Sequence, residues 1–353
     1  MKYSSKISIE KDISKAELIS SDFYKYDNYF QDSKQKIFLK SWQFVSHKNQ
    51  IDSIVYPFTF LKDLINEPYI LVNDKDIKIL SNICTHRANV LCNKKNNANL
   101  IQCNYHGRTF NLDGKLKKAP GFNEVKNFPN ETDNLKNIPI KLWNDFIFSS
   151  VISPIDIGGI LNDISKRIPD YPFSKLKFDI NKSNTFLIDA HWALYCENYL
   201  EGFHVPFIHK GLNSDINLNN YKIELLDHGV LQYTENKIPQ EYNQILNNNM
   251  YAYYYWIFPN MMFNFYNWGL SINIVEPINK NKTRVKFLSF PINGLSQPSG
   301  TDSALDVVEK EDQEVVVSVQ NGINSYHYNK GRYSAKHEIG LHYFHQLLAR
   351  YLV

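Results

Sequence analysis

Two short cysteine–histidine segments restrict the possible structure of this 353-residue chain more than any other feature. Cys84 and His86 form a Cys-x-His pair, and after sixteen intervening residues Cys103 and His106 form a Cys-x-x-His pair. Two thiolates and two imidazoles in this order suit a 2Fe-2S cluster in which sulfur binds one iron and nitrogen binds the other. Neutral imidazole in place of thiolate removes negative charge and raises the reduction potential. The motif therefore predicts an electron-transfer site.

The same four ligand types can also hold a structural zinc ion, so zinc is the alternative for this motif. Zinc ligands usually occur as separate Cys-x2-4-Cys and His-x3-5-His pairs rather than as two mixed pairs. In addition, Arg87 and the Gly107-Arg108 turn that follow the two histidines resemble the Rieske family of iron–sulfur domains. Both observations favour the cluster.

Length and composition indicate a globular protein of one or two domains. Hydrophobic residues make up 43% of the chain and charged residues 21%. The net charge of +3 is too small to favour nucleic acid or a membrane as a partner. The N-terminus lacks the apolar core of a signal peptide, and no apolar run approaches about eighteen residues, so we expect a cytoplasmic protein.

The cysteine count bears on how electrons reach the cluster. Cys92 and Cys196 lie in apolar surroundings and are expected to be small buried residues, not ligands or disulfide partners. Sparse thiols beside an iron–sulfur motif indicate a reducing compartment. A plant-type ferredoxin domain needs four cysteines of its own, and no glycine-rich dinucleotide fingerprint follows a predicted strand. We therefore expect a separate NAD(P)H-dependent reductase or ferredoxin.

The pattern along the chain predicts four segments. Residues 1–42 are expected to be a helical entry segment, and residues 43–150 a small all-β domain whose loops carry the cluster ligands. Residues 151–180 are expected to be a linker because they contain the pair Gly158-Gly159 as well as Pro169 and Pro172. Residues 181–353 mix helices with long aromatic strands and are expected to form the second domain. Helices are predicted at 192–202, 303–320 and 336–352, and strands between 251 and 274.

A second cluster of metal-ligand residue types lies in the C-terminal half. His204 and His209 would lie about 140° apart on an unbroken helix. Pro206 makes an unbroken helix unfavourable, and a local distortion could bring both imidazoles to one point. In the predicted helix from Ser303, Asp312 falls on an otherwise apolar face. That face comprises Leu305, Val308, Asp312, Val315 and Val319.

A carboxylate on an apolar face is costly to bury unless it is paired or binds a metal. His204, His209 and Asp312 together would make a two-His, one-carboxylate set, which is typical of non-haem Fe(II) oxygen chemistry. Each residue also has a simpler interpretation, because a histidine can be a hydrogen-bonded core residue and Asp312 can pair with a cation. The upstream electron-transfer motif favours the iron site, since Fe(II)/O2 chemistry needs external electrons.

At this point the chain resembles the oxygenase component of Rieske non-haem iron oxygenases, from Trp42 to the C-terminus. The matching motifs are the two cysteine–histidine pairs, the Glu-x2-His-x4-His segment from Glu201, and Asp312 with Gln320-x-Gly322 after it. The resemblance implies an α+β protein with an all-β Rieske 2Fe-2S domain. It also implies a C-terminal helix-grip (SRPBCC-type) domain, an antiparallel sheet with helices around a mononuclear Fe(II). A head-to-tail homotrimer is implied as well.

By motif position, the resemblance implies that Glu201 is the catalytic acidic residue that links His204 to His106 of a neighbouring subunit. Many relatives carry Asp there, so the longer glutamate is a departure that could alter the coupling distance. The loop Cys-Asn-Tyr-His-Gly-Arg is a second departure, because many relatives have Cys-Pro-Tyr-His-Gly-Trp. The ligand residues themselves are intact.

The substrate is indicated by two further similarities. Residues 198–206 and the following Lys210-Gly211-Leu212 are similar to the choline monooxygenase-like branch, which acts on quaternary ammonium compounds. Aromatic rings on the predicted strands could hold a trimethylammonium group by cation–π attraction. They are Tyr253, Tyr255, Trp256, Phe258, Phe263, Phe265, Tyr266 and Trp268.

Three interpretations follow from this pattern. The first is hydroxylation or N-demethylation of a choline-, betaine- or carnitine-like compound. An aromatic pocket would equally suit an aromatic ring, so the chain could be a ring-hydroxylating dioxygenase alpha subunit. The third is a Rieske electron-transfer protein whose second domain only binds a ligand.

Overall fold

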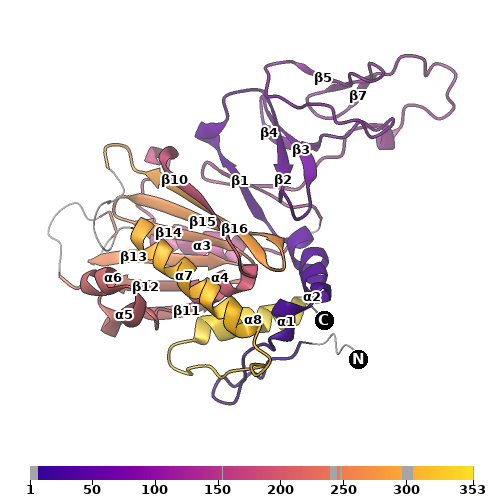
Figure 1. Ribbon diagram of the computed structural model, residues 1–353. Coiled ribbons are helices and arrows are strands. Elements are labelled where there is room, and N and C mark those ends of the chain that lie inside the picture. The colour runs from indigo at the N-terminus through magenta and orange to yellow at the C-terminus, as the bar shows by residue number, and fades with distance from the viewer. Residues whose placement is uncertain (1–6, 153, 239–244, 247–248, 296–304, 353) are drawn as a thin grey trace. The chain divides into compact units, whose positions relative to one another are not determined.

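The computed structural model describes residues 7–152, 154–238, 245–246, 249–295 and 305–352 (Figure 1). The chain divides into two compact units, which are described separately. One unit is Trp42–Pro154, and the other combines Met1–Ser41 with Ile155–Val353. None of the described helices is long and apolar enough to cross a membrane.

The unit Trp42–Pro154 is built from short antiparallel strands, and its described residues form three three-stranded sheets. The first has the order β1 (Gln43–His47), β9 (Phe146–Ser149), β8 (Ile140–Trp143). The second has the order β2 (Val55–Phe60), β3 (Glu67–Asn73), β4 (Ile77–Ser81). The third has the order β5 (Leu100–Gln102), β6 (Thr109–Asn111), β7 (Leu116–Lys118).

The core of this unit lies beneath the second and third sheets. It includes Val55, Ile70, Leu80 and Phe110, and both Cys84 and Cys103 belong to the same buried cluster. A hairpin turn follows Asn73 between β3 and β4, and a second turn contains Gly114 between β6 and β7.

Gly114 has a φ of +88°, which side chains with a Cβ rarely adopt, and a Cβ there would lie 3.1 Å from the carbonyl oxygen of Leu135. These tight turns place the two ligand loops on one rigid core.

The other unit is organised around a seven-stranded antiparallel sheet with the order β10-β16-β15-β14-β13-β12-β11. The strands are β10 (Asp179–Ile188), β11 (Lys222–Leu226), β12 (Gly229–Glu235), β13 (Met250–Ile257), β14 (Met261–Tyr266), β15 (Gly269–Asn279) and β16 (Lys282–Pro291). From β11 to β16 each strand pairs with the next along the chain, and β10 completes the edge beside β16.

Helices cover the sheet and flank the site. They are α1 (Asp22–Lys25), α2 (Asp27–Asp32), α3 (Gly158–Arg167), α4 (Trp192–Tyr199), α5 (Val205–Ile208), α6 (Lys210–Asp215), α7 (Leu305–Ile323) and α8 (Ile339–Tyr351). A π-helical turn (Ser33–Ile37) and 3-10 turns (Phe38–Lys40, Lys48–Gln50, Glu131–Asp133, Phe173–Lys175 and Leu218–Asn220) complete the described elements. The long helix α7 runs diagonally across the sheet (Figure 1).

The two faces of the sheet have different neighbours. Tyr255 points toward α3, where its hydroxyl donates to Asp163 at 2.6 Å. Its neighbour Tyr254 points to the other face, beside Asn264 of β14. Successive side chains of a strand alternate between faces, so this face carries every second residue of β12 to β15.

Large aromatic residues fix α8 to the sheet and to α4. The ring centroid of Phe344 lies 5.9 Å from that of Trp192 and 5.2 Å from that of Trp256. All three side chains are completely buried. Phe38 of the N-terminal segment meets Trp192 at 5.0 Å, so this segment also packs on the same core. Truncating such a ring to alanine typically costs about 3–5 kcal/mol.

The apolar face predicted for α7 is partly wrong. Val308 is buried, but Val319 is 45% exposed. The buried face is rotated and includes Glu309, Val316, Gln320 and Ile323. A count of apolar residues misplaced the face because two of its buried members are polar. Each has a polar partner, since the carboxyl group of Glu309 accepts a hydrogen bond from Tyr195 and the amide oxygen of Gln320 accepts one from the backbone N–H of His191.

We expect Gly340→Ala to destabilise the fold. A Cβ at Gly340 would lie 2.6 Å from the carbonyl oxygen of Leu200, so α8 must move away from the chain that leads into the site. Overpacking of this kind costs about 1–3 kcal/mol. Gly159 is the matched control because it is also the second residue of its helix and a Cβ there meets nothing within 4 Å. Urea unfolding should show a lower unfolding midpoint for Gly340→Ala alone. Equal midpoints for both variants would contradict the packing argument.

Candidate functional site: a cluster site and an iron site

The two cysteine–histidine loops come together at one end of the unit Trp42–Pro154. Cys84 and Cys103 are buried, and their sulfur atoms are within hydrogen-bonding distance. The imidazole rings of His86 and His106 lie 4.8 Å apart between centroids, and the ring of His106 is exposed. Two buried thiols and two imidazoles that reach the surface fit the donor set of a Rieske cluster.

The backbone around Cys103 also suits a thiolate ligand. Burial raises the pKa of the Cys103 thiol, but hydrogen bonds from the backbone N–H groups of Tyr105 and His106, together with contacts to the side chains of Cys84 and Asn89, lower it overall. Gly107 closes the loop with a φ of +71°, and its N–H donates to the carbonyl oxygen of Cys103 at 2.9 Å. The loop is therefore shaped to stabilise negative charge on sulfur.

Arg108 explains how this chain tolerates its departure from the usual loop sequence. The guanidinium is buried, donates to the hydroxyl of Thr85 at 2.9 Å and pairs with Asp133 at 3.4 Å. The ring of Phe122 lies 4.7 Å from it. Thr85 belongs to the first ligand loop and Arg108 follows the second, so the arginine joins the two loops.

The second set of ligand residues is brought together by a broken helix. Helix α4 ends at Tyr199, and the short helix α5 (Val205–Ile208) has Pro206 near its N-terminus. His204 precedes α5 directly and His209 follows it. The interruption expected from Pro206 is thus present, and both imidazoles face α7.

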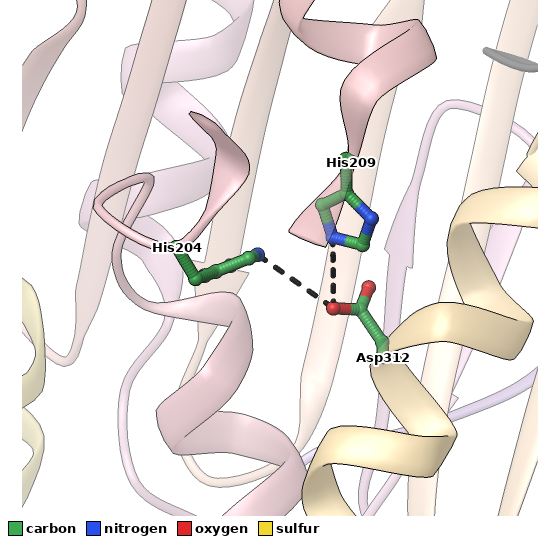
Figure 2. Close-up of side chains that lie close together, drawn as sticks. All are labelled: His204, His209 and Asp312. Carbon is green, nitrogen blue, oxygen red and sulfur yellow. Dashed lines mark hydrogen bonds and ion pairs between the residues drawn. The ribbon is translucent and has the colours of Figure 1, made fainter. Parts of the chain in front are cut away.

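Figure 2 shows the imidazoles of His204 and His209 pointing toward the carboxylate of Asp312. One Asp312 oxygen, Oδ1, lies 3.0 Å from His209 Nε2 and 3.6 Å from His204 Nε2. One ligand atom from each residue lies within 4.8 Å of the others, and the three side chains are largely buried. The proximity expected from the sequence is therefore found, and the geometry fits a two-His, one-carboxylate iron site.

In each imidazole, the ring nitrogen that does not face Asp312 contacts another carboxylate. His204 Nδ1 lies 2.6 Å from Glu201 Oε1, and His209 Nδ1 lies 2.7 Å from Glu311 Oε2. A carboxylate on Nδ1 fixes the ring so that Nε2 points at the metal position, which is the usual arrangement of metal-binding histidines. Glu311 was missed by the sequence analysis, although it lies directly before Asp312.

A pocket opens over the three ligand residues and encloses about 720 Å³ of empty space including its mouth. Six tyrosines line it: Tyr195, Tyr199, Tyr221, Tyr251, Tyr254 and Tyr266. Amide side chains also line it: Asn198, Gln232, Asn264 and Asn273. The described lining residues include no Lys or Arg.

The aromatic wall predicted from the strands is mostly wrong, because only Tyr266 of that set lines the pocket. Tyr255, Phe263 and Phe265 are on the opposite face of the sheet, and Trp256 packs against α8. The prediction counted rings along the strands without separating the two faces, and it overlooked the tyrosines of α4.

One buried carboxyl group in the pocket was also missed. Glu309 lies one helical turn before Asp312, accepts a hydrogen bond from the hydroxyl of Tyr195, and lies 3.5 Å from the side-chain nitrogen of Asn273. Burial, with the nearby charge of Asp312, raises the pKa of Glu309 well above its usual range. The misplaced face of α7 hid this residue from the sequence analysis.

A Rieske-type cluster site and a two-His, one-carboxylate site in one chain define a Rieske-type non-haem iron oxygenase. Family models agree, because residues 41–129 match the Rieske [2Fe-2S] domain and residues 173–353 match the ring hydroxylating alpha subunit (catalytic domain). The chain belongs to this family of ring-hydroxylating alpha subunits. It is therefore an enzyme rather than an electron carrier, and its domains imply a Rieske 2Fe-2S cluster, not zinc, and a mononuclear iron.

Among curated proteins, the chain is similar to choline monooxygenase from Arabidopsis thaliana, at 27% identity over 93% of this chain and 81% of the relative. It is also 28% identical to the carnitine monooxygenase oxygenase subunit of Escherichia coli K12, over 94% of this chain and 93% of the relative. Members of the family work with a separate reductase or ferredoxin and act on small molecules.

Solved structures share the fold. The quaternary ammonium Rieske monooxygenase CntA in complex with L-carnitine has a TM-score of 0.75 at 23% identity and covers 97% of each chain. Naphthalene 1,2-dioxygenase from Rhodococcus sp. has a TM-score of 0.72 at 14% identity, over 95% of this chain and 94% of the other. The expected α+β fold is therefore confirmed.

We expect Glu311→Gln to weaken iron retention because it removes the charge that holds His209. Loss of such a partner typically costs about 10–100-fold in metal affinity. Iron that survives dialysis against a graded chelator should fall for Glu311→Gln, while the visible spectrum and sulfide content of the cluster stay unchanged. Glu314→Gln is the matched control, since this exposed residue is on the same helix. Equal iron retention in both variants would show that Glu311 does not position the ligand.

Proposed function

We propose that this chain oxidises a small quaternary ammonium compound, by hydroxylation or N-demethylation, with electrons from a separate NAD(P)H-dependent reductase or ferredoxin. The observation that carries the proposal is the pocket over His204, His209 and Asp312, walled by six tyrosines and without Lys or Arg among its described residues. Aromatic faces attract a trimethylammonium group, which has no N–H group to donate in a hydrogen bond. The similarity to choline and carnitine monooxygenases supports the same substrate class.

We further propose the ligand assignments. Cys84, His86, Cys103 and His106 would hold the cluster, which passes single electrons. His204, His209 and Asp312 would hold iron(II), which supplies O2 activation when bound. The proposed domains are a cluster domain at 43–150 and a catalytic domain at 181–353. Residues 1–42 would be a helical entry segment and residues 151–180 the linker. A cytoplasmic location is part of the same proposal.

Glu201 is the proposed link between the two kinds of site. Its Oε1 lies 2.6 Å from His204 Nδ1, and its other oxygen accepts the backbone N–H groups of Phe203 and His204. In a homotrimer of the kind implied by the family, this carboxylate would connect His204 to His106 of a neighbouring copy. The exposure of His106 agrees with such a contact.

A single-turnover experiment tests the substrate class. Protein loaded with both metal groups is reduced without oxygen, mixed with choline, betaine, carnitine or aromatic acids, and then exposed to O2. We expect mass spectrometry to detect oxygen gain or methyl loss in a quaternary ammonium compound. Conversion of aromatic acids alone would instead indicate ring hydroxylation, the second candidate, whose fold is the same in naphthalene 1,2-dioxygenase.

We expect Glu201→Gln, once loaded with cluster and iron, to slow product formation per bound iron by about 10–100-fold, because the carboxylate charge between the sites is lost. Iron and sulfide contents serve as the internal control, and the rate is measured in single turnover and with the reductase. A rate equal to wild type with full metal content would disprove the linking role of Glu201.

A further inference from the structure

We propose that Glu309 is the counter-ion of the substrate, so that the pocket selects a quaternary ammonium compound with one positive charge and no carboxylate. This inference rests on the function proposed above and narrows its substrate class. A choline-type amino alcohol fits it, whereas the zwitterions betaine and carnitine do not.

The first step concerns the environment of Glu309. Its side chain is on the buried face of α7 and the residue is 9% exposed. Its contacts are the hydroxyl of Tyr195 and, at 3.5 Å, the side-chain nitrogen of Asn273. Both groups are neutral, so they hydrogen-bond the carboxyl group without compensating a charge. Without a nearby cation, burial favours the protonated form of Glu309. A cation in the pocket would supply the compensation that the carboxylate form needs.

The second step is the balance of charges around the pocket. The acidic lining residues are Glu201, Glu309 and Asp312. Glu201 and Asp312 contact the two histidines, and Glu311 contacts His209 as well, so these three carboxylates face the iron site. Glu309 is the lining carboxyl group that contacts neither histidine.

No Lys or Arg is close to Glu309 among the described lining residues, and residues 239–244, 247–248 and 296–304 contain none in the sequence. Among the described lining residues no cationic side chain offsets Glu309, and a cation on the bound molecule would do so.

The third step concerns the shape and polarity of the wall. Tyr195 and Tyr199 of α4 and Tyr254 and Tyr266 of the sheet line the same pocket as Glu309. The hydroxyl of Tyr199 donates to Asn264 at 2.6 Å and that of Tyr195 donates to Glu309, so these two hydroxyls are already engaged. Their rings remain to contact methyl groups. A quaternary ammonium group needs such ring faces and a nearby carboxylate, but no hydrogen-bond acceptor.

The fourth step excludes a carboxylate on the substrate. A second negative charge would enter a pocket that has Glu309 and no described cationic side chain to receive it. The amides of Asn198, Gln232 and Asn264 are suited to a neutral hydroxyl group instead. The pocket is thus built for a substrate that is positive at one end and neutral at the other.

The test compares binding of three probes of similar size by calorimetry to the anaerobic, metal-loaded protein. Choline carries the positive charge, 3,3-dimethyl-1-butanol is its neutral isostere, and betaine adds a carboxylate. We expect wild type to bind choline at least about tenfold more tightly than either of the other two. Glu309→Gln, which keeps a hydrogen-bonding oxygen for Tyr195, should lose that preference for choline over the isostere. Glu309→Asp should retain part of it, and Glu314→Gln all of it.

The outcomes separate this inference from the function on which it rests. Equal or tighter binding of betaine or carnitine by wild type would overturn it, as would an unchanged choline preference in Glu309→Gln. If Glu309→Gln does not fold, the inference is still tested by the affinity ratios of the three probes for wild type and for Glu309→Asp. Turnover of quaternary ammonium compounds with no role for Glu309 would reject the counter-ion alone. In the single-turnover experiment, conversion of aromatic acids with no conversion of any quaternary compound would reject the proposed function as well.

Discussion

The placement of the Asp312 carboxylate between two imidazoles is the interaction on which the rest of the catalytic unit depends. A carboxylate in this largely buried position is costly unless its partners are fixed. Both the position of helix α7 along its own axis and its rotation about that axis must therefore be fixed relative to the sheet. Two polar contacts determine that position, because Glu309 meets Tyr195 of α4 near one end of α7 and Gln320 accepts the backbone N–H of His191 near the other. The aromatic core under α8 holds α4 itself in place.

The same position of α7 makes the pocket. Helix α4 stops at Tyr199, and the chain turns before α5, so His204 and His209 face α7 and the tyrosines of α4 face the sheet. The sheet supplies the remaining wall through alternate residues of β12 to β15. The pocket wall and the proposed metal ligands thus share the helices α4 and α7. Glu309 and Asp312 are one turn apart on α7, so a cation held by the first lies close to iron held by the second.

The sequence predicted well whatever depends on local spacing. The cysteine–histidine pairs, the break at Pro206 and the three predicted helices follow from motifs and residue spacings close together in the chain. Glu309, Glu311 and five of the six pocket tyrosines were not predicted. Their roles depend on how α7 is rotated and on which face of a strand each ring occupies. Tertiary packing decides both, and a buried polar residue such as Glu309 or Gln320 shifts the apparent face of an amphipathic helix.

Both departures from the family pattern have a structural explanation in this chain. Arg108 takes the place where many relatives have tryptophan, and it spans from Thr85 of one ligand loop to Asp133. Because Asp133 offsets its charge, the arginine acts as a brace between the loops more than as a positive charge beside the cluster. Glu201 is longer than the aspartate of many relatives. The added length lets one oxygen hold His204 Nδ1 while the other accepts the backbone N–H groups of Phe203 and His204. The same side chain therefore orients the ligand and stabilises the turn that positions it.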